Sequence, residues 1–263
     1  FILISGYFLI NKKFEAKKLL KIWLQVLAYS ISIFILYAIF GDKEKIHIID
    51  ILRSIFPVLL SNYWFVTVYI FMYILSPLIN KFLTEISKGS YKKLLIILPI
   101  LFTAEGIITS ARADDYIIAQ LPIMLYVYAL GAYIKLYKIE VYEKMNSIKC
   151  FFTFIILYYS ILLVQCINGE KNIFINMLQG YISNIESIMV IGATVSLFYT
   201  FEKLTIKKNY FINSLAKVGF TTYLITENPY LIPIFWKNIF CITSTSIIQN
   251  LEMLISAEIF IYC

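Results

Sequence analysis

The chain has 263 residues, of which 60% are hydrophobic and 15% are charged, and its formal net charge is +7 at pH 7. Soluble domains are nearer half apolar and a quarter charged, so this composition excludes an ordinary soluble domain and is typical of an integral membrane protein. The positive charge does not indicate a nucleic-acid partner, because the basic residues lie in short loops between apolar runs and form no arginine-rich face.

Nine apolar segments follow one another along the chain. They cover residues 1–10 (a partial segment), 20–40, 62–80, 93–109, 116–135, 149–168, 180–201, 216–236 and 245–263. About twenty helical residues, at 1.5 Å each, cross the roughly 30 Å of hydrocarbon in a bilayer. The segments lack the alternation of outer-membrane strands, and a helix is the remaining way to pair every backbone amide in lipid. The sequence therefore predicts an all-α fold, a polytopic transmembrane helix bundle.

The loops between these segments support the assignment through their charge. Most of the 23 lysines and arginines lie in loops 11–21, 81–93, 135–149 and 202–217, which alternate with loops that hold few. Cytoplasmic loops are enriched in these residues, so the alternation predicts both the number of helices and their orientation. We expect the four basic loops on the cytoplasmic side.

Both ends of the chain lie inside apolar runs. It opens with Phe1-Ile2-Leu3-Ile4 and closes with a run that ends at Cys263. We therefore expect a fragment that is truncated at both ends, with residues 1–263 forming a single membrane-embedded domain.

The longest outer connection, residues 41–61, has a helical pattern of its own. Apolar residues recur at helical spacing at Ile48, Leu52, Ile55 and Leu59. We expect an amphipathic helix that lies along the outer surface. His47, the only histidine, precedes it, and a lone exposed histidine is usually incidental.

Five carboxylates lie within the apolar segments, where a charge is costly and usually faces protein or a wet cavity. They are Glu105, Glu186, Glu227, Glu252 and Glu258. Lys217 and Lys237 bracket the Glu227 segment about 30 Å apart at the helical rise, so Glu227 and Asn228 fall near the middle of the membrane.

Pro229 and Pro233 follow this pair directly. Proline lacks an amide donor and clashes with the preceding turn, so we expect the helix to bend here and to free backbone carbonyls beside the carboxylate. In the segment 180–201, Ser183 and Glu186 share one helix face, which we expect to point inward. Hydrogen bonds that merely bridge helices remain an alternative for all these groups.

The first basic loop contains Lys18 and Lys21, which could attract cytosolic polyphosphate groups or anionic lipid heads. Topology alone explains these lysines equally well. The four cysteines are far apart and show no metal-ligand spacing, so we predict no metal site.

Several short stretches along the chain form a recognisable set. They are Ser5-Gly6-Tyr7-Phe8, Tyr63-Trp64-Phe65, Tyr73-Ile74-Leu75-Ser76-Pro77-Leu78-Ile79-Asn80, Leu130-Gly131-Ala132-Tyr133-Ile134-Lys135 and Tyr223-Leu224-Ile225-Thr226-Glu227-Asn228-Pro229, which Trp236-Lys237 continues. In order and spacing they resemble the membrane-bound acyltransferase family 3, the O-acetyltransferases of bacterial surface polysaccharides, whose patterns read SGYF, YWF, YLLSPxLN, LGAYIR and YLIHENP.

The resemblance implies an enzyme of ten transmembrane helices in the bacterial cytoplasmic membrane, of which about nine segments are present here. Such an enzyme takes an acyl group, usually acetyl, from cytosolic acyl-CoA as co-substrate. It places the group on a hydroxyl of a polysaccharide or a lipid-linked glycan. The resemblance implies no bound cofactor, and membrane lipid would be the other partner.

The acceptor alcohol needs a base, because it is a poor nucleophile at neutral pH. The family assigns this role to a histidine in the first helix, which would precede Phe1, so we expect this chain to be inactive or partial. Glu227 and Asn228 remain as catalytic candidates, and Glu105, Glu186, Ser183 and Thr226 as polar groups of a cavity.

The chain departs from the family pattern in two stretches. Thr226 stands where the family often has histidine. Lys18 and Lys21 stand where relatives tend to carry arginines on the acyl-CoA side, and lysine keeps the charge but lacks the bidentate fork that suits phosphate. Two other functions stay open: a carrier or exporter of a glycan or acyl intermediate, and a non-catalytic subunit of a glycan synthase.

Overall fold

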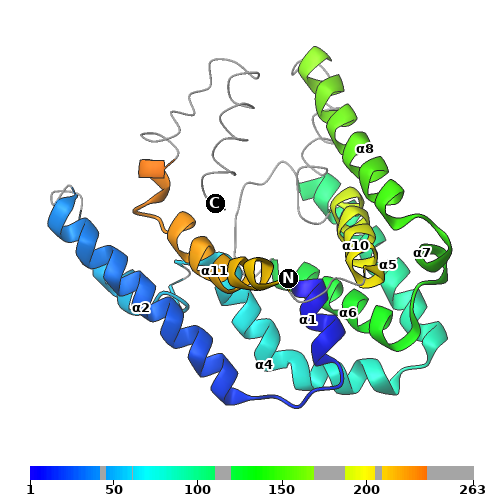
Figure 1. Ribbon diagram of the computed structural model, residues 1–263, viewed down its shortest axis with the longest axis horizontal. Helices are drawn as coiled ribbons and strands as arrows, with labels where there is room; N and C mark the ends of the chain where they lie inside the picture. Colours follow the sequence, from blue (N-terminus) through cyan, green and yellow to red (C-terminus); the bar gives the residue numbers. More distant parts are fainter. Residues whose placement is uncertain (42–45, 61, 110–119, 169–186, 205–208, 236–263) are drawn as a thin grey trace. The chain divides into compact units, whose positions relative to one another are not determined.

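The computed structural model describes residues 1–41, 46–60, 62–109, 120–168, 187–204 and 209–235. Every regular element within these ranges is a helix (Figure 1), which confirms the predicted all-α fold. Two of the described helices, α2 (Ala16–Phe40) and α4 (Trp64–Glu85), are long and apolar enough to cross a membrane. The number of crossings in the whole chain stays a prediction.

The chain divides into two compact units. Unit 1 consists of Phe1–Phe14 and Phe71–Thr205, and unit 2 consists of Glu15–Ile70 and Ile206–Cys263. Helix α4 begins in unit 2 and continues into unit 1. The expectation of a single domain over 1–263 stays a prediction.

Unit 1 contains α1 and most of the central helices. Their bounds are α1 Ile2–Leu9, α5 Lys88–Thr109, α6 Leu121–Tyr137, α7 Glu140–Lys144, α8 Ser147–Asn168 and α10 Ile188–Lys203. Unit 2 contains α2, the first part of α4, α3 (Ile48–Ile55) and α11 (Tyr210–Thr226). Helices α2, α4 and α5 extend past the predicted apolar segments, because lysine and glutamate at their polar ends are good helix formers.

Helices α1 and α6 cross at two glycines, one in each helix. A methyl group added at Gly6 would overlap the carbonyl oxygen of Tyr128, and one added at Gly131 would overlap that of Leu3. Small residues let two backbones approach closely, which is how helices associate in lipid. The glycines of the Ser-Gly-Tyr-Phe and Leu-Gly-Ala-Tyr stretches therefore serve one helix crossing.

A proline inside a helix leaves one backbone carbonyl without its usual N–H donor. In unit 1, side-chain hydroxyl groups donate hydrogen bonds to these carbonyls. Pro77 in α4 has no N–H for the Tyr73 carbonyl, which instead accepts a 2.7 Å hydrogen bond from the Ser76 hydroxyl. Pro99 in α5 leaves the Leu95 carbonyl in the same position. The Tyr126 hydroxyl donates to that carbonyl at 3.2 Å. The chain thus satisfies the backbone groups that lipid could not.

The helix ends beside the basic loops of unit 1 meet one another. The Lys135 ammonium lies 4.7 Å from the centre of the Tyr7 ring, and the Lys88 ammonium lies 5.6 Å from the centre of the Tyr137 ring. The backbone N–H of Ile139 donates to the Tyr199 hydroxyl at 2.7 Å. These contacts place the ends of α1, α5, α6 and α10 together, as the alternation of loop charge predicts.

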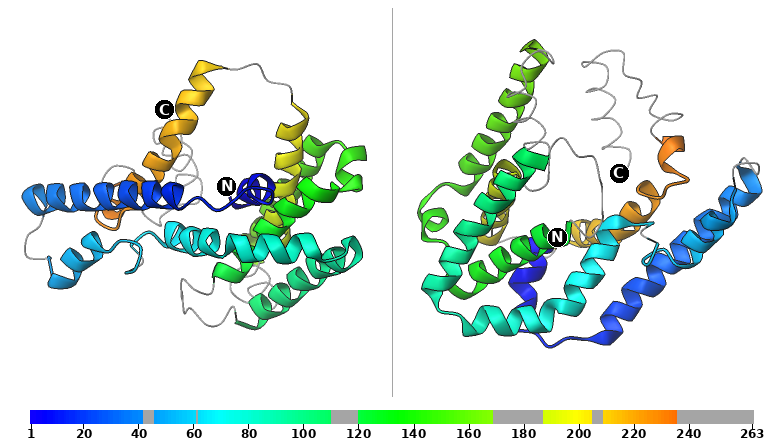
Figure 2. Two further views of the ribbon diagram at one scale, coloured as in Figure 1. Left: turned by 90° about the horizontal axis from the view of Figure 1, so that it is seen from below. Right: turned by 180° about the vertical axis from the view of Figure 1, so that it is seen from behind.

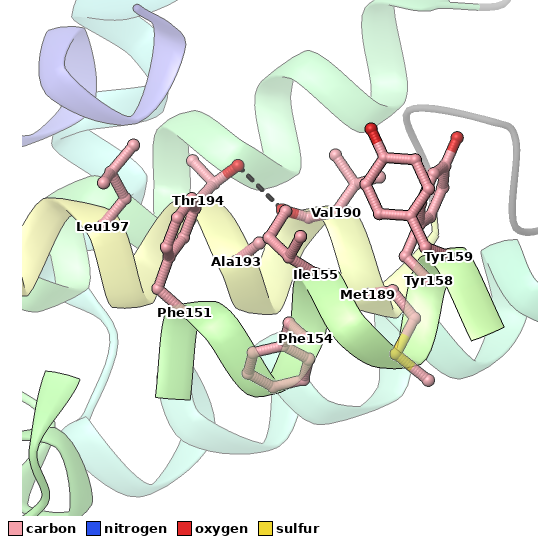
Figure 3. A pocket seen from close by; sticks show the side chains of 10 residues that line it. All are labelled: Phe151, Phe154, Ile155, Tyr158, Tyr159, Met189, Val190, Ala193, Thr194 and Leu197. Carbon is pink, nitrogen blue, oxygen red and sulfur yellow. Dashed lines mark hydrogen bonds between the residues drawn. The ribbon is translucent and has the colours of Figure 1, made fainter. Parts of the chain in front are cut away.

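Helices α8 and α10 lie side by side (Figure 2). An apolar groove lies between them. The groove has a volume of about 210 Å³ and is lined mainly by aromatic and aliphatic side chains, with Tyr158 and Tyr159 together at one end (Figure 3). The hydroxyl of Thr194 donates to the Val190 carbonyl of its own helix at 2.8 Å. The groove therefore offers little polar chemistry.

Candidate functional site

Helix α11 ends at Thr226, in the middle of the segment 216–236. The sequence predicts a bend here, but the helix stops and a new turn follows, in which the amides of Leu231 and Ile232 both donate to the Asn228 carbonyl at 2.9 Å. Pro229 has no N–H to donate to the Ile225 carbonyl, so the backbone N–H of Asn228 donates to that carbonyl instead, at 3.4 Å. A proline thus converts the predicted bend into a break.

The break frees the Leu224 carbonyl, because the Asn228 amide that would have paired with it has moved to Ile225. The Tyr63 hydroxyl, at the start of α4, donates to this carbonyl at 3.1 Å. Both side chains are buried, with exposures of 1% for Tyr63 and 0% for Leu224. The prediction of a carbonyl freed near Glu227 is therefore confirmed, and a tyrosine hydroxyl donates a hydrogen bond to it.

The side chain of Asn228 is fully buried and joins the break in α11 to the residue that precedes α4. The amide nitrogen donates to the Tyr63 hydroxyl at 2.8 Å, and the amide oxygen accepts from the backbone N–H of Tyr230 at 3.0 Å. The Tyr230 hydroxyl in turn reaches the Asp50 carbonyl of α3 at 3.4 Å. Asn228 thus holds the break against the start of α4.

The surroundings of this polar group are apolar. Val26, Val58, Val66 and Ile70 pack with Tyr63 and Leu224 in one cluster. Among the described residues of unit 2, however, three buried side-chain atoms have no hydrogen-bond partner: the Ser30 hydroxyl, the Asn62 amide nitrogen and the Tyr223 hydroxyl. A buried polar atom without a partner costs about 1–3 kcal/mol, so such atoms usually contact water or a ligand.

The Tyr223 hydroxyl faces the beginning of α4. Its polar neighbours include the backbone amides of Phe65 and Val66 and the carboxylate of Glu227. The first amides of a helix lack partners within the helix and carry partial positive charge. Two amides, a hydroxyl and a carboxylate can together stabilise an oxyanion and accept a proton, which are the requirements of acyl transfer.

A comparison with protein-family models matches residues 1–257 to the acyltransferase domain of the acyltransferase 3 family. The chain belongs to this family. Members transfer acyl groups and are typically associated with membranes. Comparisons with curated proteins and with solved structures gave no match.

Thr226, in the acyltransferase stretch where the family often has histidine, donates its hydroxyl to the Thr222 carbonyl at 3.1 Å. A second contact reaches the Tyr223 carbonyl at 3.5 Å. Its hydroxyl hydrogen is therefore used within α11, and Thr226 acts as a structural residue of the helix end.

Lys18 and Lys21 lie on the first turns of α2 and are exposed. Lys18 pairs with Glu15 at 2.7 Å, which partly neutralises its charge. Helices α2 and α11 run in the same direction, because Gln25 contacts Thr221 at 3.5 Å and Tyr37 stacks on Tyr230 with ring centres 4.8 Å apart. Ten residues of helical rise then place Lys21 about 15 Å along the axis from Glu227.

The other predicted polar groups cannot be placed at this site. Ser183, Glu186, Glu252 and Glu258 lie outside the described residues, and Glu105 lies in α5, where its side chain is not among those described. In the part of the chain that the structure describes, no three His, Cys, Asp or Glu side chains come together as metal ligands would.

Sequence reasoning missed Tyr63 and Tyr223 as parts of the site. The two tyrosines lie within the Tyr-Trp-Phe and Tyr-Leu-Ile-Thr-Glu-Asn-Pro stretches, so the resemblance marked their positions but not their contact. Their ring centres are 6.3 Å apart.

Proposed function

We propose that this acyltransferase moves an acyl group, most simply acetyl, from cytosolic acyl-CoA to a hydroxyl of a cell-surface polysaccharide or of its lipid-linked precursor. The observation that carries the proposal is the buried polar site around the break in α11. The Tyr223 hydroxyl lies there near the first amides of α4 and the Glu227 carboxylate, beside an apolar cluster of a chain that belongs to an acyltransferase family.

The chemistry follows from these groups. Glu227 accepts the proton of the acceptor hydroxyl, directly or through an imidazole of the kind that the family resemblance implies. The oxygen then attacks the thioester carbonyl, and the Tyr223 hydroxyl with the first α4 amides stabilises the oxyanion. The carbon–sulfur bond breaks, CoA leaves as the thiol after it takes up the proton, and the glycan keeps the new ester.

The donor enters from the side of the basic loops in this proposal. Lys18 and Lys21 attract its phosphate groups, and about 15 Å separates Lys21 from Glu227 along the bundle axis. A donor with its charged head at the lysines therefore needs a long flexible arm, which CoA has in its pantetheine chain. The acceptor meets the acyl group at the break.

We also propose that the protein crosses the cytoplasmic membrane of a bacterium several times. Support comes from the alternating loop charges and from the parallel course of α2 and α11, which that alternation requires. Large aliphatic side chains on the outside of the helices agree with this placement, among them Leu36 at 56% and Ile156 at 63% exposure.

The function is tested in a host that makes an unacetylated glycan. The chain is expressed with the codons that precede Phe1 in its gene, and the glycan is examined for O-acetyl signals by NMR. O-acetyl signals that require the gene support the proposal, whereas a glycan that stays unmodified despite membrane insertion of the protein contradicts it.

A carrier of a glycan or acyl intermediate is the second candidate, because unpaired buried hydroxyls could also line a path for a polar solute. A carrier consumes no acyl-CoA. Membranes that contain the protein are given acetyl-CoA and glycan acceptor, and free thiol is measured. Release of thiol that depends on the acceptor supports the transferase, and its absence during measurable glycan movement supports the carrier.

A further inference from the structure

Helix α3 of unit 2 carries its polar and apolar sides in an unusual orientation. Ser54 is only 1% exposed, and the Asp50 side chain is 17% exposed. The apolar residues are the exposed ones, with Ile48 at 78%, Ile51 at 42% and Ile55 at 43%. The polar side of α3 therefore contacts the rest of unit 2, and the apolar side points away from it.

A surface helix of a soluble protein has the opposite orientation, with its apolar stripe against the core. A contact from another segment fixes the inward position of the polar side, because the Tyr230 hydroxyl donates to the Asp50 carbonyl at 3.4 Å. The Ser54 hydroxyl donates to the same carbonyl within α3 at 2.8 Å. The connection after α3 is anchored as well, because Val58 packs in the apolar cluster and its carbonyl accepts from Thr67 at 2.9 Å.

The outward apolar side continues a surface that α2 begins. Before the connection to α3, α2 exposes Ile39 at 58% and Phe40 at 82%, and it is long and apolar enough to cross a membrane. Arg53, on the flank of α3, is half exposed and reaches Asp50 only at 4.0 Å. A helix with an apolar side, a cationic flank and a neighbouring span has the composition of one that lies in a membrane interface.

We propose that α3 lies flat in the membrane surface, with Ile48, Ile51, Leu52 and Ile55 among the lipid acyl chains and Arg53 at the phosphate groups. The occupant of this face is the bilayer itself. The inference rests on the membrane placement proposed above and not on acyl transfer. Because Tyr230 contacts both Asp50 and Asn228, α3 anchors the break in α11 at a fixed depth.

The test measures the environment of spin labels in the intact chain, in phospholipid nanodiscs, after the four native cysteines are replaced by alanine. Single cysteines at Ile51 and Ile55 carry the label on α3. Leu36→Cys on α2 reports a lipid-facing position, and Lys12→Cys reports an exposed loop. Collision rates with oxygen, which partitions into lipid, are compared with those of a water-soluble nickel complex.

We expect the labels at Ile51 and Ile55 to collide mainly with oxygen, at a shallower depth than the Leu36 label, while the Lys12 label collides mainly with nickel. Nickel-dominated collisions at both α3 positions, with oxygen still dominant at Leu36, would place α3 in water and overturn the inference. Low collision rates with both reagents would show that protein covers the face and would also overturn it. Nickel dominance at Leu36 would overturn the membrane placement as well.

Discussion

The side-chain amide of Asn228 donates a hydrogen bond of 2.8 Å to the hydroxyl of Tyr63, 165 residues away in the chain. The Tyr63 hydroxyl in turn donates a hydrogen bond to the Leu224 carbonyl at 3.1 Å. The two residues come from different stretches of the acyltransferase resemblance. Their contact gives both residues a structural role, since Tyr63 pairs with the freed Leu224 carbonyl and Asn228 donates to the Tyr63 hydroxyl.

Replacement of Asn228 by alanine removes a donor to Tyr63 and the acceptor of the Tyr230 amide. The Tyr63 hydroxyl left behind is buried and the Tyr230 amide is partly buried, so we expect a loss of about 2–4 kcal/mol in the free energy of unfolding. Thermal unfolding of the purified protein in detergent measures the loss. Asn11→Ala, at an exposed position outside the helices, is the matched control and should leave the midpoint unchanged; equal midpoints for both variants would contradict the structural role of Asn228.

Tyr223→Phe separates chemistry from stability. Within the described residues its buried hydroxyl has only the Phe65 and Val66 amides beside it as hydrogen-bonding groups, so its removal should change the unfolding midpoint little. If the hydroxyl stabilises the oxyanion, the turnover rate should fall by roughly 100-fold. Tyr126→Phe is the opposite control, because that hydroxyl holds the Leu95 carbonyl in unit 1. It should cost about 1 kcal/mol of stability and leave turnover unchanged.

Glu227→Gln keeps the shape of the side chain and removes its charge. We expect transfer to fall at least 100-fold, because a general base contributes about that much or more. The amount of protein inserted in the membrane should not change. Glu85→Gln, on the exposed end of α4, is the control for loss of a carboxylate, and full activity of Glu227→Gln would assign that residue a structural role.

The sequence alone was sufficient to predict most of the helices, because hydropathy and loop charge are local properties. It also predicted the freed carbonyl near Glu227, since Pro229 lacks a donor whatever surrounds it. The contact of Asn228 with Tyr63 was beyond its reach, because no local pattern tells which side chain fills a freed carbonyl. For the same reason the sequence offers Asn228 as a catalytic candidate without indicating the structural contacts that it makes with Tyr63 and Tyr230.

The orientation of α3 shows a different limit. Its apolar spacing predicted an amphipathic helix, and the helix is present. Periodicity says that a helix has two sides but not which side faces the protein. The hydrogen bond from Tyr230 to Asp50 decides that question, and it joins residues 180 positions apart.

Lys18 and Lys21 can be tested through donor affinity. In the proposed function they attract the phosphates of acyl-CoA, so Lys21→Gln should raise the KM for the donor several-fold while kcat stays constant, and more so at low salt. Lys18→Gln should have a smaller effect because Glu15 already offsets its charge. Glu15→Gln should then lower the KM for the donor. A KM that stays the same in all three variants would show that these lysines do not bind the donor.

The crossing of α1 and α6 gives a prediction that is independent of function. A methyl group at Gly6 or Gly131 would overlap a backbone carbonyl of the other helix, which neither a rotamer change nor a flexible side chain can relieve. We expect Gly6→Ala and Gly131→Ala each to cost about 3 kcal/mol, the upper part of the range for overpacked sites. Gly219→Ala is the matched control, because none of the described atoms lies within 4 Å of a methyl group added there in α11. It should stabilise the protein by about 0.5–1 kcal/mol through helix propensity. Thermal unfolding should therefore shift down for the two α1 and α6 variants and up for the control, and an unchanged midpoint for Gly6→Ala and Gly131→Ala would show that the two helices do not cross at these glycines.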